Sequence, residues 1–297
     1  MLRGGQGVYG YDEGDTTRGM RRGRHNERVI CAAHPFLDGP FPRAFAHRGW
    51  HVGELAGMEN SLAAFRRAAA EGYRYLETDV RATRDGVVVV IHDSTLDRAT
   101  DGSGAVAELR WSTVRAARVG GREPVCRLAD LLEELPDSLL NIDVKADSAV
   151  APVLTLLERT NAWHRVCLAS FSESRLVWLR RAAGPRLLTS MGRISAAALR
   201  LLSVLPGRSA TGWRVAVPLH GAVAQLPLRY CGIPVVDRAL LRCAHRRGLE
   251  VHVWTVDRAG QMRELLDLGV DGLITDRPDV LREVLHARGA WSTDPRG

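Results

Sequence analysis

The stretch LEVHVWTVDRAGQMRELLDLGVDGLITDRPDVLREVLHARG, residues 249–289, contains two rounds of one pattern. An apolar run typical of a buried strand (249–256) is followed by a helical stretch (259–269). A second such run (270–276) is followed by a helix that a proline opens (278–289). Strands that alternate with helices favour a parallel sheet, because each helix returns the chain to the start of the next strand.

The same alternation extends back to residue 43. Further strands are expected at 43–47, 73–80, 87–92, 139–145, 166–171, 186–190 and 213–218. Further helices are expected at 60–72, 128–135, 149–160, 173–182, 195–205 and 238–248. About eight strand–helix units predict an α/β fold of the TIM (β/α)8 barrel type. A doubly wound open sheet is the alternative, although no GxGxxG motif opens the first helix.

The pattern also divides the chain. Residues 1–42 are rich in Gly and Arg without periodicity, which predicts a disordered tail. The barrel domain is expected over 43–289, with a short C-terminal tail at 290–297. Residues 93–126 are too many for a simple loop, so we expect a small insertion after the second barrel strand.

Charge and cysteine usage limit the class of protein. The net charge is +7, but arginines alternate with acids along the chain and no nucleic-acid-binding motif occurs. The basic run 18–28 leaves weak contact with an anionic membrane surface open, although a solvated tail is the favoured interpretation. Five separated cysteines without a CxxC pair, no signal core and no apolar run long enough for a membrane span predict a cytoplasmic protein. The oligomeric state is not predicted.

Polar side chains gather where the predicted strands end. In a TIM barrel the carboxyl ends of the strands build the active site. Strand residues two apart share a face, so Glu77 and Asp79 point together, as do Asp143 and Lys145. The candidates at or just beyond strand ends are His47, Arg48, Glu77, Asp79, His92, Asp93, Asp143, Lys145 and Trp254.

Three of these candidates are carboxylates that would repel one another without a cation between them. Oxygen ligands from Glu77, Asp79 and Asp143 suit one divalent cation, Mg²⁺ or Ca²⁺. The alternative is that each acid pairs with one of the many arginines. Lys145 is the only lysine in the chain, which suggests a site where a compact point charge fits and the arginine fork does not.

An ordered set of motifs resembles the glycerophosphodiester phosphodiesterase family. The motifs are AHRG (46–49), EN (59–60), ETDV (77–80), DGVVVVIHD (85–93), NIDVK (141–145), VHVWTVD (251–257) and LGVDGLITDRPDVL (268–281). The resemblance implies a TIM barrel, a small-molecule glycerophosphodiester substrate, and metal-dependent cleavage to glycerol 3-phosphate and an alcohol.

The resemblance also implies roles for single residues. His47 and His92 resemble the catalytic histidine pair, Arg48 and Lys145 the phosphate-binding cations, and Phe171 and Trp254 the wall of the alcohol or glycerol pocket. Glu77, Asp79 and Asp143 resemble the metal-binding acids. His51 and His252 are interpreted as filler or surface residues.

Two positions depart from the family pattern. Asp143 stands where the family commonly has glutamate, and Met58 where it usually has proline. The sequence leaves alternatives open: a lysophospholipase D or a sphingolipid-cleaving enzyme with an apolar channel in the insertion, a sugar-phosphate isomerase, or a non-enzymatic binding protein. It does not decide which histidine is the acid.

Overall fold

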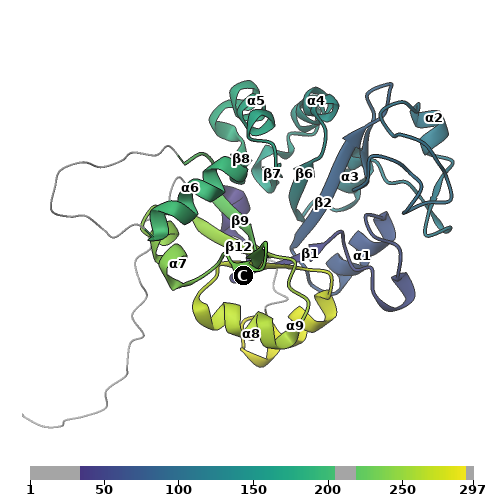
Figure 1. Cartoon of the computed structure of the whole chain (residues 1–297). Helices are drawn as coiled ribbons and strands as arrows, with labels where there is room; N and C mark the ends of the chain where they lie inside the picture. Colours follow the sequence, from purple (N-terminus) through teal and green to yellow (C-terminus); the bar gives the residue numbers. More distant parts are fainter. Residues whose placement is uncertain (1–33, 205–218, 292–297) are drawn as a thin grey trace, which may run out of the picture.

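The structure, a computed structural model, describes residues 34–204 and 219–291. Parallel strands form a central sheet that helices surround (Figure 1). The edge strands meet at a parallel bridge between Ser190 and Val223, so the sheet rolls into the predicted TIM barrel. In spatial order the barrel strands are β8 (Leu188–Thr189), β7 (Val166–Ala169), β6 (Leu139–Val144), β2 (Tyr75–Ala82), β1 (Arg43–His47), β13 (Gly272–Thr275), β12 (Glu250–Trp254) and β9 (Val223–Pro227).

Side-chain caps mark the start of several helices. Ser61 caps the first helix by accepting a hydrogen bond from the Ala64 amide at 3.1 Å, and Asp237 caps another through the Leu240 amide at 2.8 Å. The outer helices are α1 (Leu62–Ala70), α3 (Leu128–Glu134), α4 (Val150–Thr160), α5 (Glu173–Ala183), α6 (Arg193–Val204), α7 (Arg238–His245), α8 (Ala259–Leu268) and α9 (Pro278–Ala287). Short 3-10 turns are η1 (Pro35–Asp38), η2 (Gly53–Leu55), η3 (Asp147–Ala149), η4 (Ala162–Arg165) and η5 (Gly184–Arg186).

An insertion follows the second barrel strand, as predicted. Its first strand, β3 (Val88–Val90), pairs antiparallel with β2 and is not part of the barrel wall. A short helix, α2 (Trp111–Val114), and a small hairpin, β4 (Arg118–Val119) with β5 (Glu123–Pro124), complete it. Its apolar side chains form a core of their own, which includes Val89, Ile91, Leu96, Val106 and Val114. The insertion therefore buries many of its apolar residues within itself, while Val88 and Val90 of β3 join the main core.

One barrel strand was missed by the sequence analysis. The strand expected at 213–218 lies outside the described residues, while β9 forms at Val223–Pro227. Its apolar run is short and holds Gln225, whose amide donates a hydrogen bond to Asn141 Oδ1 at 2.9 Å inside the barrel. The hairpin of β10 (Arg229–Tyr230) and β11 (Ile233–Pro234), which follows, was not predicted either.

The predicted tails are too long at both ends of the barrel. Phe36 of η1 is buried against Phe45 and Tyr75, and the Tyr75 hydroxyl donates to the Phe36 carbonyl at 2.8 Å. At the other end Trp291 packs edge-on against Tyr73. Residues 1–33 and 292–297 lie outside the described residues, and the domain boundaries otherwise stay predictions.

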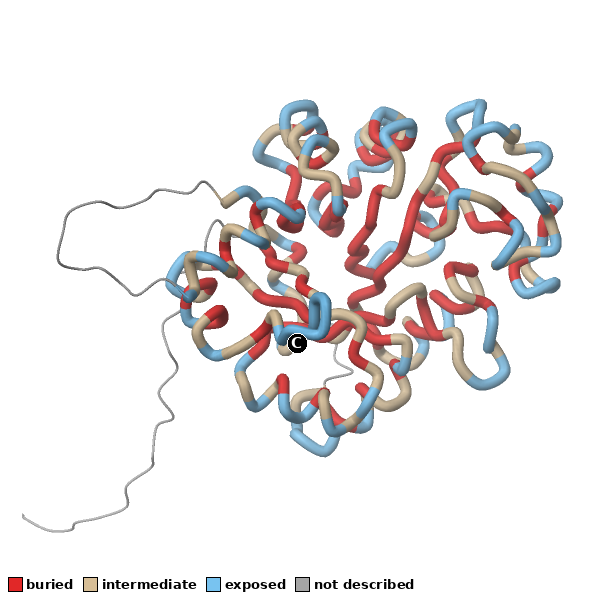
Figure 2. The backbone as a smooth tube through the Cα atoms, in the orientation of Figure 1, coloured by how far each residue is buried: buried red, intermediate tan, exposed pale blue. Residues whose placement is uncertain are grey.

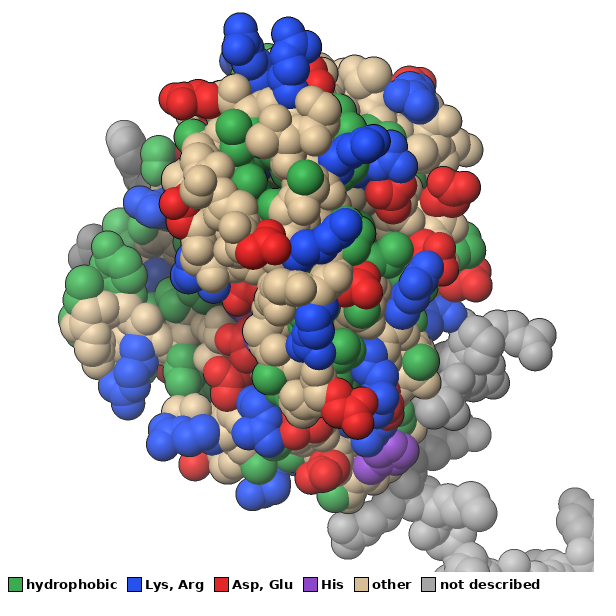
Figure 3. Space-filling model, turned by 90° about the vertical axis from the view of Figure 1, so that its right-hand side faces the viewer, with side chains coloured by type: hydrophobic (Ala, Val, Ile, Leu, Met, Phe, Trp, Pro, Cys, Tyr) green, Lys and Arg blue, Asp and Glu red, His purple; other side chains and the backbone are tan. Residues whose placement is uncertain are grey.

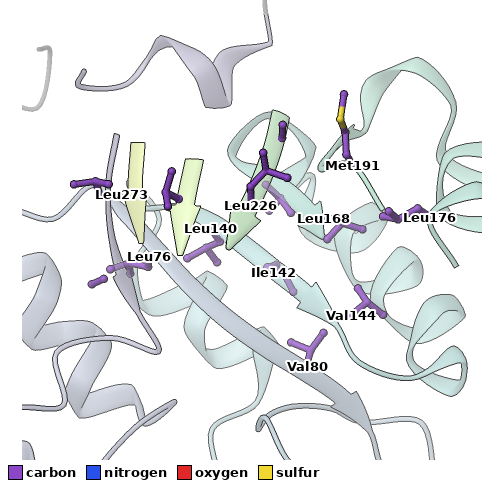
Figure 4. Packing of buried hydrophobic residues seen from close by; sticks show 14 of the residues in the cluster. Leu76, Val80, Leu140, Ile142, Val144, Leu168, Leu176, Met191, Leu226 and Leu273 are labelled. Carbon is purple, nitrogen blue, oxygen red and sulfur yellow. The ribbon is translucent and has the colours of Figure 1, made fainter. Parts of the chain in front are cut away.

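Alternation along the strands separates an apolar layer from a polar one. Leu76, Val80, Ile142 and Val144 belong to the core between sheet and helices (Figure 4). Burial follows the strands, while the outer helices alternate between buried and exposed residues (Figure 2). The intervening residues of β2 and β6 carry the charged side chains predicted to share a face.

The surface agrees with the interpretation of the net charge. On the face that carries α1 and the insertion, cationic and anionic side chains are intermixed (Figure 3). The four described cysteines, Cys126, Cys167, Cys231 and Cys243, are free thiols. Among the described residues no helix has the length and apolar character that a bilayer span requires. The cytoplasmic location remains a prediction.

Candidate active site

His47 ends β1 and lies between two carboxylates. Its Nδ1 is 2.6 Å from Asp276 Oδ1, just beyond the end of β13, and its Nε2 is 3.6 Å from Glu77 Oε2. Burial opposes protonation, but the negative charges of Glu77 and Asp276 outweigh it and raise the pKa of His47. With Asp276 accepting a hydrogen bond from Nδ1, Nε2 is the nitrogen left to exchange a proton.

Arg48 turns into the barrel mouth through an unusual backbone conformation. Its φ is 55° and that of Gly49 is 84°, and a Cβ at Gly49 would lie 2.9 Å from the Ala64 backbone. Arg48 Nη1 donates to Glu59 Oε1 at 3.0 Å, and Nε lies 3.1 Å from Asp79 Oδ2. The Nε–H makes no hydrogen bond within the described structure, so it remains a donor for a ligand.

The three predicted metal-binding acids converge on one side of the mouth. β2 and β6 are in register, so that Asp79 lies opposite Asp143. Lys145 Nζ lies between these two carboxylates, 2.8 Å from Asp79 Oδ1 and 2.6 Å from Asp143 Oδ2. Asn60 donates to Asp79 Oδ2 at 3.0 Å. All the acids of this set are buried, so their charges interact in a medium of low dielectric constant.

Burial and neighbouring charges shift the pKa values of Glu77, Asp79 and Lys145 in different directions. Burial first, and then the charge of Asp79, raise the pKa of Glu77 to about 8. Burial opposes ionisation of Asp79 too, but Lys145 and Arg48 outweigh it and lower the pKa of Asp79. For Lys145, burial is outweighed by Asp143 and Asp79, which raise its pKa. The lysine is therefore charged, and Glu77 is the carboxyl that holds a proton most readily.

His92 reaches the site from the insertion. Its Nδ1 is 2.6 Å from Asp93 Oδ1, and Arg81 Nε donates to its carbonyl oxygen at 3.0 Å. Arg98 forms hydrogen bonds both with Asp93 and, at 2.6 Å, with Glu59, the carboxylate that also binds Arg48. A continuous chain of ion pairs thus joins His92 to Arg48.

Two aromatic side chains stand at the ends of β7 and β12. The rings of Phe171 and Trp254 are 5.6 Å apart and nearly perpendicular, at 85°. Lys145 Nζ lies 5.7 Å from the centre of the Phe171 ring. Phe171 is 46% exposed, so the pair is open to solvent at the rim of the mouth and sits directly beside the charged set.

Comparison with known proteins identifies the family. The sequence profile described as "Glycerophosphoryl diester phosphodiesterase family" matches residues 47–280. The chain is 46% identical to "Probable glycerophosphodiester phosphodiesterase 2" of Mycobacterium tuberculosis, over 84% of this chain and 92% of that one. The chain belongs to the glycerophosphodiester phosphodiesterase family. It is an enzyme, a phosphoric diester hydrolase.

Two further relatives bear on this phosphodiesterase. The glycerophosphodiester phosphodiesterase structure from Agrobacterium tumefaciens has a TM-score of 0.63 and 28% identity, covering 80% of this chain and 98% of its own. A human lysophospholipase D is 25% identical over 81% of this chain and 85% of its own length. The fold and the enzyme class predicted from the motifs are thus confirmed.

Some residues at the phosphodiesterase site were not predicted. Asp276 contacts His47 and, through the same Oδ1 atom, lies 3.1 Å from His51 Nε2. Its place after a barrel strand is the signal that could have found it. Asp93 stands next to His92 at the end of a predicted strand, whereas Arg98 carried no such signal, since it reaches the mouth only through the fold of the insertion. His252, by contrast, is buried at the other end of the barrel, 3.1 Å from Glu250 Oε2.

The buried acids of this phosphodiesterase have features that bear on the binding of a divalent cation. Among the described residues no three His, Cys, Asp or Glu side chains already form a metal-binding group, and Lys145 engages two of the expected oxygens. Asp143 Oδ1, however, is buried without a hydrogen-bond partner, and Glu77 is buried with a raised pKa. A buried acceptor without a donor, beside a carboxyl that resists ionisation, fits a site for a cation.

Proposed function

We propose that this enzyme hydrolyses glycerophosphodiesters to sn-glycerol 3-phosphate and an alcohol, using a divalent cation and two histidines. The proposal rests mainly on one observation: Lys145, Arg48 and His47 converge on the buried carboxylates of β2 and β6. Cations that face a shared buried space recognise phosphate oxygens. Membership of the family supplies the diester as the substrate class.

The side chains divide the chemistry between them. Arg48 Nε and the Lys145 ammonium bind the phosphoryl oxygens and offset the charge that builds there. His47, held through Nδ1 by Asp276, exchanges a proton through Nε2, while His92 is held in the same way by Asp93. One histidine removes the proton from the attacking oxygen, and the other protonates the departing alkoxide. A divalent cation held by Glu77, Asp79 and Asp143 would supply Lewis-acid polarisation of the phosphoryl group.

The test is release of glycerol 3-phosphate from glycerophosphocholine or glycerophosphoglycerol. Activity is measured after EDTA treatment and again with Mg²⁺ or Ca²⁺ restored. We expect loss with EDTA and recovery with one of the cations. Full activity after complete chelation would contradict the metal-binding role of the three acids, and no release under any cation would contradict the proposed substrate.

Lys145→Arg tests the role of the point charge. The guanidinium keeps the charge but is broader, and the lysine ammonium touches two carboxylates in a buried space. We expect kcat/KM to fall by roughly tenfold to a hundredfold, because a 1 Å misplacement at a reacting centre has effects of this size. Full activity of the variant would leave the enzyme class intact and remove this explanation of the single lysine.

A lysophospholipase D activity is the second candidate. Exposed apolar side chains follow the ends of three neighbouring barrel strands: Phe171 after β7, Ile194 after β8, and Tyr230 and Ile233 after β9. The insertion, which the sequence suggested as the place of an apolar channel, buries many of its apolar residues in its own core. Comparing kcat/KM for lysophosphatidylcholine and glycerophosphocholine decides between the two, and preference for the acylated substrate would favour the second candidate.

A further inference from the structure

Arg193 opens α6 directly after the end of β8, at the rim of the mouth. Its guanidinium carbon lies 5.4 Å from the centre of the Phe171 ring. The same ring lies 5.7 Å from Lys145 Nζ, and its edge-to-face partner is Trp254. In Figure 1 α6 and α5 are neighbours on the barrel wall, in agreement with the approach of Arg193 to the Phe171 ring. Two cations therefore already approach one aromatic ring.

The charge of Arg193 is not neutralised. In the residues from 34 to 204 and from 219 to 291 it has no carboxylate partner, in contrast to Lys145 and Arg48. Glu173 lies at the same turn, but its carboxylate accepts from the Ser195 hydroxyl at 3.2 Å and lies 3.6 Å from Arg180 Nη1. Arg193 is exposed, so a ligand can reach it.

An aromatic pair at the mouth of a phosphodiesterase would ordinarily attract a quaternary ammonium group through cation–π interaction. Here the ring is already approached by Arg193 and Lys145. A cationic head group would therefore gain little from a cation–π interaction with this ring. The Arg193 guanidinium, which has no carboxylate partner in the described structure, would also repel it. The hydroxyl and carboxylate groups of other alcohols would instead accept hydrogen bonds from the Arg193 guanidinium.

We propose that Arg193, with Phe171 and Trp254, forms a head-group subsite that selects glycerophosphodiesters of neutral or anionic alcohols over those of choline. The inference rests on the proposed function and adds the substrate class. Two unit charges about 7 Å apart at a protein surface repel enough to change kcat/KM by about threefold to thirtyfold. Arg193 is thus a specificity-determining residue and takes no part in the proton transfers.

The test compares two esters of equal shape. One is glycerophosphocholine, and the other is its 3,3-dimethylbutyl analogue, in which carbon replaces the charged nitrogen. The ratio of their kcat/KM values does not depend on the fraction of active enzyme, so a partly misfolded variant remains interpretable. We expect wild type to favour the neutral ester by about threefold to thirtyfold.

Three variants complete the experiment. Arg193→Glu should reverse the preference, and Arg193→Gln should bring the ratio close to one. Arg159→Glu is the matched control, because Arg159 is exposed in the last turn of α4, at the opposite end of the barrel. It changes the net charge equally and should leave the ratio unchanged.

The outcomes are distinct. A ratio that is the same in wild type and Arg193→Glu overturns the subsite, as does a wild-type preference for the choline ester. An equal shift in Arg159→Glu assigns the effect to the overall field and also overturns it. Failure of wild type to hydrolyse either ester with any cation overturns the proposed function, and the subsite with it.

Discussion

Both ends of the barrel contain buried charged side chains, but their balance differs. At the amino-terminal ends of the strands, Arg43 binds both oxygens of Glu250, at 3.2 and 2.9 Å. Its guanidinium also donates to the carbonyls of Leu37, Gly39 and, at 3.1 Å, Pro40. Arg43 faces the Glu250 carboxylate there, His252 Nε2 lies 3.1 Å from the same carboxylate, and the backbone of residues 37–40 completes the set of acceptors.

The carboxyl-terminal end is not balanced in this way. Glu77, Asp79 and Asp143 face Lys145 and Arg48, and the third neighbour with a basic side chain, His47, lies 3.6 Å from Glu77. Asp143 Oδ1 and Arg48 Nε are buried without hydrogen-bond partners in the described structure. Burial of charge therefore does not by itself indicate a binding site. His252 Nδ1 at the amino-terminal end is also buried without a hydrogen-bond partner in the described structure. The distinguishing feature is therefore the excess of carboxylates over cations at the mouth, and the two ends should respond differently to mutation.

The largest expected effect is at the mouth. His47→Gln or His92→Gln should lower kcat/KM by about 10²–10⁴, the usual contribution of a positioned acid or base. Thermal unfolding should change little, because neither histidine fills the apolar core. The matched control is His245→Gln, which removes a histidine 2.7 Å from Asp271 on the outer side of the barrel. Equal losses in the control would refute the assignment.

Mutation of the Arg43–Glu250 pair at the amino-terminal end should lower the stability of the protein and leave its turnover unchanged. Arg43→Met removes the guanidinium that binds both oxygens of the partly buried Glu250 and leaves His252 as its neighbour, which should lower the free energy of unfolding by about 3 kcal/mol. In the folded protein kcat/KM should stay unchanged. Denaturant unfolding checks the first expectation and initial rates check the second. Arg66→Met, which breaks an exposed pair with Glu134, should cost at most about 1 kcal/mol.

Low pH should reduce the stability that Glu250 contributes at the amino-terminal end of the barrel. Burial opposes ionisation of Glu250, but hydrogen bonds from His252 and Arg43 outweigh it and lower its pKa from 4.5 to about 2. A lowered folded-state pKa contributes stability that is present above the unfolded value and is lost as pH falls from 4.5 to about 2. The contribution is at most about 3 kcal/mol. The difference in free energy of unfolding between wild type and Glu250→Gln should shrink over this range, and a constant difference would contradict the assignment.

The smallest effect is expected for the ion-pair chain of the insertion. The hydrogen bond from Arg98 is the main reason that the pKa of Asp93 is lowered to about 2. Arg98→Gln should release Asp93 and Glu59, and so loosen His92 and Arg48, with a fall in kcat/KM of about tenfold. Arg127→Gln, which breaks a separate, partly exposed pair with Asp130, is the control. Comparable effects of both would mean that the chain of ion pairs has no special role.

Much of this protein could be read from its local sequence. Strand and helix periods, Ser and Asp caps and the proline of α9 are local, so the barrel could be expected from the alternation alone. The alternation also placed Glu77 with Asp79, and Asp143 with Lys145, since side-chain direction in a strand has a period of two. β9 was missed because its inward Gln225 breaks the apolar run, and it is satisfied only by Asn141 across the barrel.

Only the tertiary structure decided which of these residues meet. Lys145 was expected beside the acids, but its position between Asp79 and Asp143 depends on the register of β2 with β6. Asp276 joins His47 from 229 positions away, and Arg193 reaches Phe171 because parallel pairing sets β7 beside β8. The sequence by itself determined the residue types and their faces. Their partners followed from barrel closure, because contacts between distant strands depend on register and closure and not on any local pattern.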